Sequence, residues 1–264
     1  MSRTAIIAGQ GGLAQAVAAR LRDPVVAALE GFAPPIPHQT FRLERLVPFF
    51  DWLAGQGVER VTFAGAVRRP RLDPEAFDPR TASLVPRILG AMQSGDDAAL
   101  REVIALFEEA GFTVAGTAEI CPDLVPGPGV LVGEPTAADI ADADRAAQIV
   151  EGLGALDLGQ GAVVAQGLCL AVETLPGTAA MLDFVAAHRD MRPRPNGPRG
   201  VFWKAPKPGQ DRRIDLPAIG PDTIGQVARA GLAGIAWQAG GVIMLEREAV
   251  MERARDAGVF LWAR

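Results

Sequence analysis

The chain has 264 residues, of which 49% are apolar and 22% are charged, and its formal net charge is −5. This composition is that of a globular protein with one large or two small domains, and no apolar run reaches the roughly 18 residues of a membrane span. A nucleic-acid partner is not expected, because no basic tract with interleaved aromatic residues occurs.

The first half of the chain alternates between short apolar runs and amphipathic segments, which predicts a Rossmann-like α/β domain. Asp96 or Asp97 is expected to cap the last of its helices. We expect strands at residues 4–8, 24–29, 60–64 and 112–115, and helices at residues 13–21, 43–54 and 97–110.

A stretch rich in proline and glycine at residues 121–135 predicts a domain boundary, with domains at residues 1–132 and 133–264. The second half is expected to be a further α/β domain with a mixed sheet. Helices are predicted at residues 137–153, 178–188 and 222–230, a hairpin at 161–173, and strands at 201–203, 235–237, 242–245 and 259–262.

Two local features predict a cytoplasmic protein. The N-terminal residues lead directly into a glycine turn and lack the apolar core of a signal peptide. Cys121 and Cys169 lack metal-ligand spacing, and we expect both to be buried thiols in a reducing compartment.

The turn from Gly9 to Ala14 reads G-x-G-x-x-A and lies between a predicted strand and a predicted helix. This is the context of a dinucleotide-binding turn, and Glu30 lies where a ribose-binding acid is expected. Two interpretations stay open: a site for NAD(P) or another nucleotide phosphate, and a tight turn needed only for close packing of the helix on the strand.

Lys204 and Lys207 are the only lysines in a chain with 24 arginines, and both lie in residues 204–217, here called the lysine loop. Lysine is a common ligand of phosphate oxygens, and its point charge is not equivalent to the planar guanidinium of arginine. With two histidines and no tyrosine in the chain, chemistry is expected to depend on carboxylates, lysine and a hard metal ion.

Asp211 and Asp215 are four residues apart in the lysine loop, and two such carboxylates could hold Mg²⁺ against a diphosphate. The competing interpretation is a solvated loop in which both aspartates form surface ion pairs with Arg212 and Arg213.

In the hairpin, Gln166-Gly167 and Glu173 lie on strands that are otherwise apolar. Buried polar groups need partners, and either a satisfied core network or contact with a ligand would supply them.

The segments together resemble the LpxI-type UDP-2,3-diacylglucosamine pyrophosphatases of lipid A biosynthesis over nearly the whole chain. The most specific block is Lys204-Ala-Pro-Lys-Pro-Gly-Gln-Asp-Arg-Arg-Ile-Asp-Leu-Pro-Ala-Ile-Gly220. The other blocks are residues 5–13, 95–104, 153–160, 166–173, 177–182 and 231–236. Ala165 and Ala179 depart from the family pattern, in which a glutamine and an acid are usual.

The resemblance implies Mg²⁺-dependent hydrolysis of UDP-2,3-diacylglucosamine to UMP and 2,3-diacylglucosamine 1-phosphate (lipid X). The residues expected to be catalytic are Asp215, Asp211, Lys204 and Lys207, and the metal ligands among them are Asp215 and Asp211. The residues expected to bind substrate are Gly9, Gly11, Gly12, Leu13, Gln166, Gly167, Glu173, Gly177, Thr178, Gln210 and Arg213.

The expected partner is the UDP-linked acylated glucosamine, with no nucleic acid. A homodimer and peripheral contact with the inner face of the inner membrane stay open. The alternative function is an NAD(P)-binding oxidoreductase or a non-catalytic nucleotide-binding protein that uses the turn Gly9–Ala14.

Overall fold

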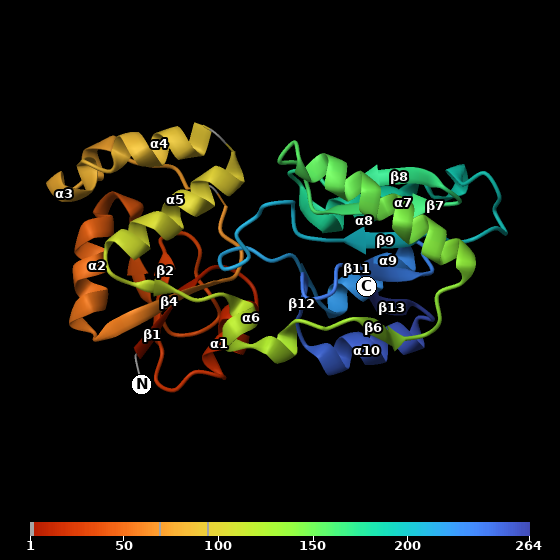
Figure 1. Ribbon diagram of the computed structural model, residues 1–264, viewed down its shortest axis with the longest axis horizontal. Helices are drawn as coiled ribbons and strands as arrows, with labels where there is room; N and C mark the ends of the chain where they lie inside the picture. The colour runs from red at the N-terminus through yellow and green to blue at the C-terminus, as the bar shows by residue number, and fades with distance from the viewer. Residues whose placement is uncertain (1–2, 69, 94) are drawn as a thin grey trace. The chain divides into compact units, whose positions relative to one another are not determined.

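The computed structural model describes residues 3–68, 70–93 and 95–264 and divides into two compact units (Figure 1). The first unit comprises Met1–Pro122 and Asp211–Asp215, and the second comprises Asp123–Gln210 and Leu216–Arg264. The units thus separate at residue 122, whereas the sequence suggested a boundary after residue 132. The middle of the lysine loop also belongs to the first unit.

In the described part of the first unit, five parallel strands form a sheet in the order β3-β2-β1-β4-β5, the order of a Rossmann-like half. Its strands are β1 (Arg3–Ala8), β2 (Val25–Leu29), β3 (Gln39–Phe41), β4 (Val58–Ala64) and β5 (Thr113–Val114). Its helices are α1 (Leu13–Ala18), α2 (Leu46–Gly55), α3 (Pro79–Ala82), α4 (Val85–Gln93), α5 (Asp96–Glu109) and α6 (Thr117–Ile120).

Phe107 of α5 lies at the centre of the core of the first unit and is 2% exposed. Its ring meets Phe50 of α2 edge-on at 4.9 Å between centroids, and Phe63 of β4 edge-on at 5.3 Å. Edge-to-face pairs at these distances add stability beyond the area that they bury. The aromatic core therefore fixes α5 against α2 and the sheet.

The main sheet in the described part of the second unit has six strands in the order β6-β13-β11-β9-β7-β8. Strands β9, β11 and β13 are parallel, while β6, β7 and β8 are antiparallel to their neighbours. The strands are β6 (Gly129–Val132), β7 (Gly161–Ala165), β8 (Leu168–Val172), β9 (Val201–Lys204), β11 (Gly234–Trp237) and β13 (Phe260–Ala263). Strands β10 (Ala218–Ile219) and β12 (Ile243–Met244) pair separately in parallel.

Helices cover both faces of this sheet: α7 (Ala137–Gly154), α8 (Gly177–Ala187), α9 (Pro221–Arg229) and α10 (Arg247–Asp256). Because side chains alternate along a strand, Trp203 packs in the core with α7, whereas Phe202 packs in the core with α8, α9 and α10. Figure 1 shows α7 lying along β7 and β9. The α/β class with a parallel first sheet and a mixed second sheet is confirmed.

Several local expectations differ from the structure. Helix α5 has Gly95 at its N-cap position without a side-chain cap, so the prediction of Asp96 or Asp97 as the cap is wrong. Cys121 is buried as expected, but Cys169 is exposed at the edge strand β8. Strands β3, β6 and β10 and helices α3, α4, α6 and α10 were not predicted.

Within the described ranges, no helix is both long enough and apolar enough to cross a membrane.

We predict opposite effects on stability for two glycine-to-alanine substitutions in the second unit. A Cβ at Gly234 would lie 2.3 Å from the ring of Phe260, its neighbour on β13, whereas a Cβ at Gly152 on α7 would meet no atom within 4 Å. Gly234→Ala should lower the free energy of unfolding by about 1–3 kcal/mol through overpacking. Gly152→Ala should raise it by about 0.5–1 kcal/mol through helix propensity. Denaturant titration measures both, and equal effects of the two changes would contradict this packing.

Candidate active site

Lys204 is the last residue of β9 and is almost fully buried, with 6% of its side chain exposed. Its Nζ donates a hydrogen bond of 2.5 Å to Oγ1 of Thr178, and the Thr178 hydroxyl donates one of 2.9 Å to Oε1 of Glu173. Oε2 of Glu173 lies 3.6 Å from Nζ, so the buried ammonium has a carboxylate partner, as burial of a charge requires. The structure therefore brings together Lys204, Thr178 and Glu173.

Two glycines leave room for Glu173 beside Lys204. A Cβ at Gly159 would lie 2.1 Å from the carbonyl oxygen of Glu173, and a Cβ at Gly161 would lie 2.7 Å from its Oε2. Gly161 also pairs in register with Lys204 across β7 and β9. Thr178 is placed by α8, which begins at Gly177, a residue with φ 85°. The carboxyl end of the parallel strand β9, where α/β folds commonly bind ligands, thus carries this cluster.

Lys207 and Gln210 extend the polar surface of the second unit. Nζ of Lys207 lies 2.6 Å from Oδ1 of Asp157, and Oε1 of Gln210 accepts a hydrogen bond of 2.8 Å from the backbone N–H of Lys207. Gln160 donates to the same Oε1 at 3.1 Å. Asp157 and Gln160 were not identified from the sequence, since an acid or amide in a turn carries no signal by itself.

Gln166 and Gly167 lie at the opposite end of β7 from Lys204, in the hairpin turn, with φ of 56° and 80°. Their backbone N–H groups donate to the carboxylate of Asp142 on α7 at 3.0 and 2.7 Å. The Gln166 side chain donates to the carbonyl oxygen of Arg194 at 2.9 Å. These bonds form the satisfied network that was one of the two interpretations, and a contact of Gln166 or Gly167 with substrate stays a prediction. Asp142 was missed, although a buried acid among the alanines of α7 is an unusual position.

The glycine turn lies in the first unit, after the central strand β1. The N–H of Gly9 donates to the carbonyl oxygen of Ala64 at 2.9 Å, and a Cβ at Gly9 would lie 2.5 Å from the carbonyl oxygen of Ala66. Gly9 therefore serves close packing. Gly11 has φ 93°, and no side chain caps the start of α1 at Gly12 and Leu13. The location beside β1 and β4 is the switch point at which this strand order binds nucleotides.

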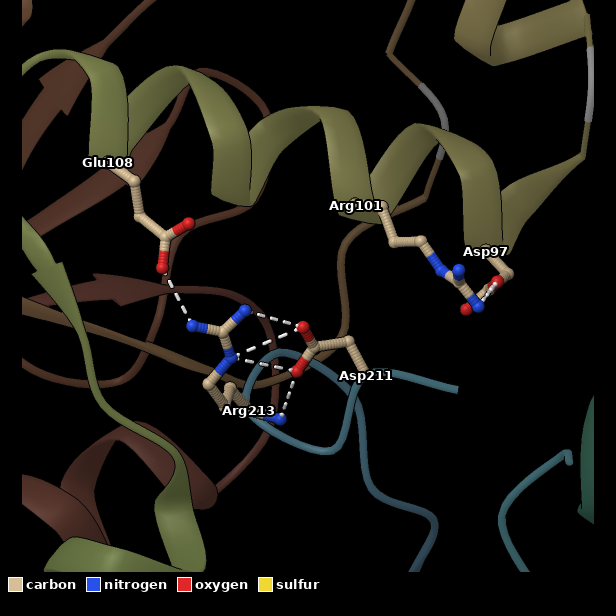
Figure 2. Close-up of polar contacts among 5 residues, drawn as sticks. All are labelled: Asp97, Arg101, Glu108, Asp211 and Arg213. Carbon is tan, nitrogen blue, oxygen red and sulfur yellow. Dashed lines mark hydrogen bonds and ion pairs between the residues drawn. The ribbon is translucent and has the colours of Figure 1, made fainter. Parts of the chain in front are cut away.

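Arg213 lies between two carboxylates in the first unit (Figure 2). Its Nη2 donates to Oδ2 of Asp211 at 2.7 Å and its Nε to Oδ1 at 3.0 Å, while its Nη1 donates to Oε1 of Glu108 on α5 at 2.7 Å. The hydrogen bonds from Arg213 hold the pKa of Asp211 below its usual range, and the charge of Arg101 acts in the same direction. Asp211 therefore stays ionised as the partner of a guanidinium.

An open groove of about 300 Å³ lies beside the start of α8 in the second unit. Its lining is mainly apolar and consists of Ala171, Val172, Thr174, Pro176, Gly177, Ala180, Met181 and Phe184. Leu175 next to it is 97% exposed and Phe184 is 53% exposed. Gly177 is part of the lining and adjoins Thr178, so the groove begins beside the Lys204 cluster.

Comparison with known proteins covers both units. Residues 3–124 match the family model described as the LpxI N-terminal domain, and residues 127–262 match the LpxI C-terminal domain. The chain is also 39% identical over 271 aligned positions to a Caulobacter vibrioides protein named UDP-2,3-diacylglucosamine pyrophosphatase LpxI, covering 99% of this chain and 97% of that protein. The chain belongs to the LpxI family. The resemblance seen in the sequence is confirmed.

A metal site in this LpxI chain would draw on few carboxylates. Within residues 3–68, 70–93 and 95–264, no group of three or more histidine, cysteine, aspartate or glutamate side chains is placed to hold a metal ion. Mg²⁺ commonly uses only one or two carboxylates together with substrate phosphates, so oxygen donors of the lysine loop fit this ion in kind. Both oxygens of Asp211 already accept hydrogen bonds from Arg213.

We predict a pH-dependent contribution of Asp211 to the stability of this LpxI protein. Because its pKa is lowered in the folded state, the contribution is present above the pKa of the unfolded chain, about 3.9, and is lost as the pH falls through the folded-state value. Asp211→Asn should therefore be less stable than wild type above about pH 5, and the difference should vanish in stronger acid. Unfolding followed by circular dichroism from pH 2 to 7 measures it. A difference that is the same at every pH would contradict the Asp211–Arg213 bond.

Proposed function

We propose that this protein hydrolyses the pyrophosphate bond of UDP-2,3-diacylglucosamine to give UMP and 2,3-diacylglucosamine 1-phosphate. The observation that carries this proposal is the match to the Caulobacter vibrioides pyrophosphatase over 99% of the chain. The presence of both family domains supports it, since neither half of the chain has been replaced by another kind of domain.

The polar clusters suit a substrate that carries a diphosphate. Lys204 is an ammonium held at the carboxyl end of β9, and Lys207 follows it in the same loop. Ammonium and hydroxyl groups fixed in advance can stabilise negative charge on a diphosphate without reorganising during the reaction. In our proposal Lys204 and Lys207 bind the diphosphate oxygens, and Thr178 and Glu173 hold the Lys204 ammonium in place.

Dependence on Mg²⁺ is part of the proposal, with Asp215 as the protein ligand. When bound, the ion would neutralise charge on the diphosphate and lower the pKa of the attacking water. In this proposal Asp211 holds Arg213 in place. Substitution of Asp211 should therefore lower activity by changing the position of the lysine loop.

The groove beside α8 is proposed to cover part of the acylated sugar. Its apolar lining and the exposed Leu175 and Phe184 offer the surface that acyl chains need to leave water. Its start at Gly177 supports this assignment, because Thr178 belongs to the Lys204 cluster.

We predict that Asp215→Ala lowers kcat at least about a hundredfold at saturating Mg²⁺, the size seen when a group that stabilises transition-state charge is removed. Release of UMP from UDP-2,3-diacylglucosamine measures the rate. Asp51→Ala is the matched control, since Asp51 is an exposed aspartate of the first unit that pairs with Arg80 at 2.6 Å. The control should retain wild-type activity. A wild-type rate for Asp215→Ala would remove this residue from the proposed mechanism.

Nucleotide specificity separates this proposal from the oxidoreductase alternative. The strand order of the first unit is compatible with several kinds of nucleotide, so it does not distinguish the two functions, and binding measurements are needed. We predict that UDP or UMP with Mg²⁺ raises the melting temperature and that NAD(H) does not, because only a ligand of the folded state stabilises it. Stabilisation by NAD(H) alone would favour the alternative.

A further inference from the structure

The residues Asp211–Asp215 form a single turn whose backbone is tied to Asp211. The carbonyl oxygen of Asp211 accepts hydrogen bonds from the N–H groups of Ile214 at 3.3 Å and of Asp215 at 3.4 Å. Its side chain accepts the N–H of Arg213 at 3.0 Å. Any group that fixes Asp211 and Arg213 therefore also fixes the backbone from which the Asp215 carboxylate extends.

The turn is attached to the first unit by contacts of two kinds. Ile214 packs against the core of the first unit, and a Cβ at Gly116 would lie 3.2 Å from the Cα of Arg213. The polar contact is the ion pair between Nη1 of Arg213 and Oε1 of Glu108, at 2.7 Å. Figure 2 shows Glu108 reaching from α5 to the outer edge of the guanidinium, whose other side faces Asp211.

Glu108 can hold Arg213 in a fixed position because Glu108 directly follows Phe107 on α5. Burial of the Phe107 ring among Phe50 and Phe63 fixes the position of α5, and the Glu108 backbone with it. The guanidinium of Arg213 is planar and donates to Glu108 on the helix and to Asp211 in the turn. Its fixed donor geometry restricts how the turn can lie against the helix.

We propose that Glu108 is a positioning residue for Asp215 and acts through Arg213. This inference rests on the proposed hydrolysis of UDP-2,3-diacylglucosamine. In it, Arg213 is a clamp between α5 and the turn, rather than a ligand of the substrate phosphates. Loss of the Glu108 carboxylate frees one side of the clamp, and the turn that carries Asp215 becomes less ordered.

The helix supplies a matched control at the next position. Glu109 also forms a close pair with an arginine, Arg87, through hydrogen bonds of 2.7 and 2.8 Å, and it is similarly exposed to solvent. This pair joins α5 to α4 and does not involve the turn. Glu109→Ala therefore removes an equivalent interaction from the same helix without touching Arg213.

Steady-state kinetics with UDP-2,3-diacylglucosamine form the first arm of the test. Glu108→Ala should lower kcat at least about tenfold, with KM changed less than about twofold, because small displacements of a reacting group reduce the rate more than they reduce binding. Glu108→Gln keeps an acceptor oxygen for Arg213 and should restore most of the rate. Glu109→Ala should match wild type. A wild-type kcat for Glu108→Ala, or an equal loss for Glu109→Ala, would overturn the proposal.

Hydrogen exchange forms the second arm of the test, and this measurement does not depend on whether the protein hydrolyses the substrate. The amide hydrogens of residues 213–215 should exchange faster in Glu108→Ala than in wild type and Glu109→Ala. Unchanged exchange in Glu108→Ala would overturn the clamp. If wild type fails to hydrolyse the substrate while the exchange result holds, the proposed function fails and the clamp stands as a structural feature.

Discussion

The hydrogen bonds of Arg213 to Asp211 and Glu108 hold the middle of the lysine loop in the first unit, while both ends of the loop belong to the second unit. The chain belongs to the second unit up to Gln210, contributes five residues to the first unit, and belongs to the second unit again from Leu216. A guanidinium can donate to two carboxylates at once only if both carboxylates are held in place. Glu108 is held by α5, whose position is fixed by the packing of Phe107 against Phe50. The location of Asp215 is a consequence of this arrangement.

A second constraint is the burial of Lys204. An ammonium with little exposure is costly unless it is paired, and the bond to Thr178 and the nearby carboxylate of Glu173 reduce that cost. The position of Glu173 depends on two glycines, because Gly159 and Gly161 leave the space that Glu173 fills. An arginine would present its donors in a planar fork, so it is not equivalent to the compact Lys204 ammonium between Thr178 and Glu173.

The sequence predicted the parts of the fold that depend on local periodicity. Strands β1, β2 and β4 and helices α5 and α7 follow from apolar spacing, and the hairpin turn at Gln166 and Gly167 follows from its glycine. Strand β6 was missed because its partner β13 is more than a hundred residues away and its surroundings are rich in proline. Helix α10 was missed because its apolar face consists of only a few residues, among them Val250 and Ala254.

The sequence predicts residues for the candidate site but not the contacts among them. The unusual composition of the lysine loop marks it in the sequence, and Thr178 and Glu173 are predicted as substrate-binding residues, but their contacts with Lys204 are not predicted. Which loop residues face α5 depends on tertiary packing, so Glu108 had no signal of its own. The pairing of Asp211 with Arg213 was foreseen only as an alternative to metal binding.

The most direct measurement of the central claim is ³¹P NMR of UDP-2,3-diacylglucosamine incubated with the protein and Mg²⁺. The account predicts that the two diphosphate resonances disappear together and that two monophosphate resonances, of UMP and of the sugar 1-phosphate, replace them. Retention of the diphosphate resonances, or their conversion to those of free UDP through cleavage at the sugar, would contradict it.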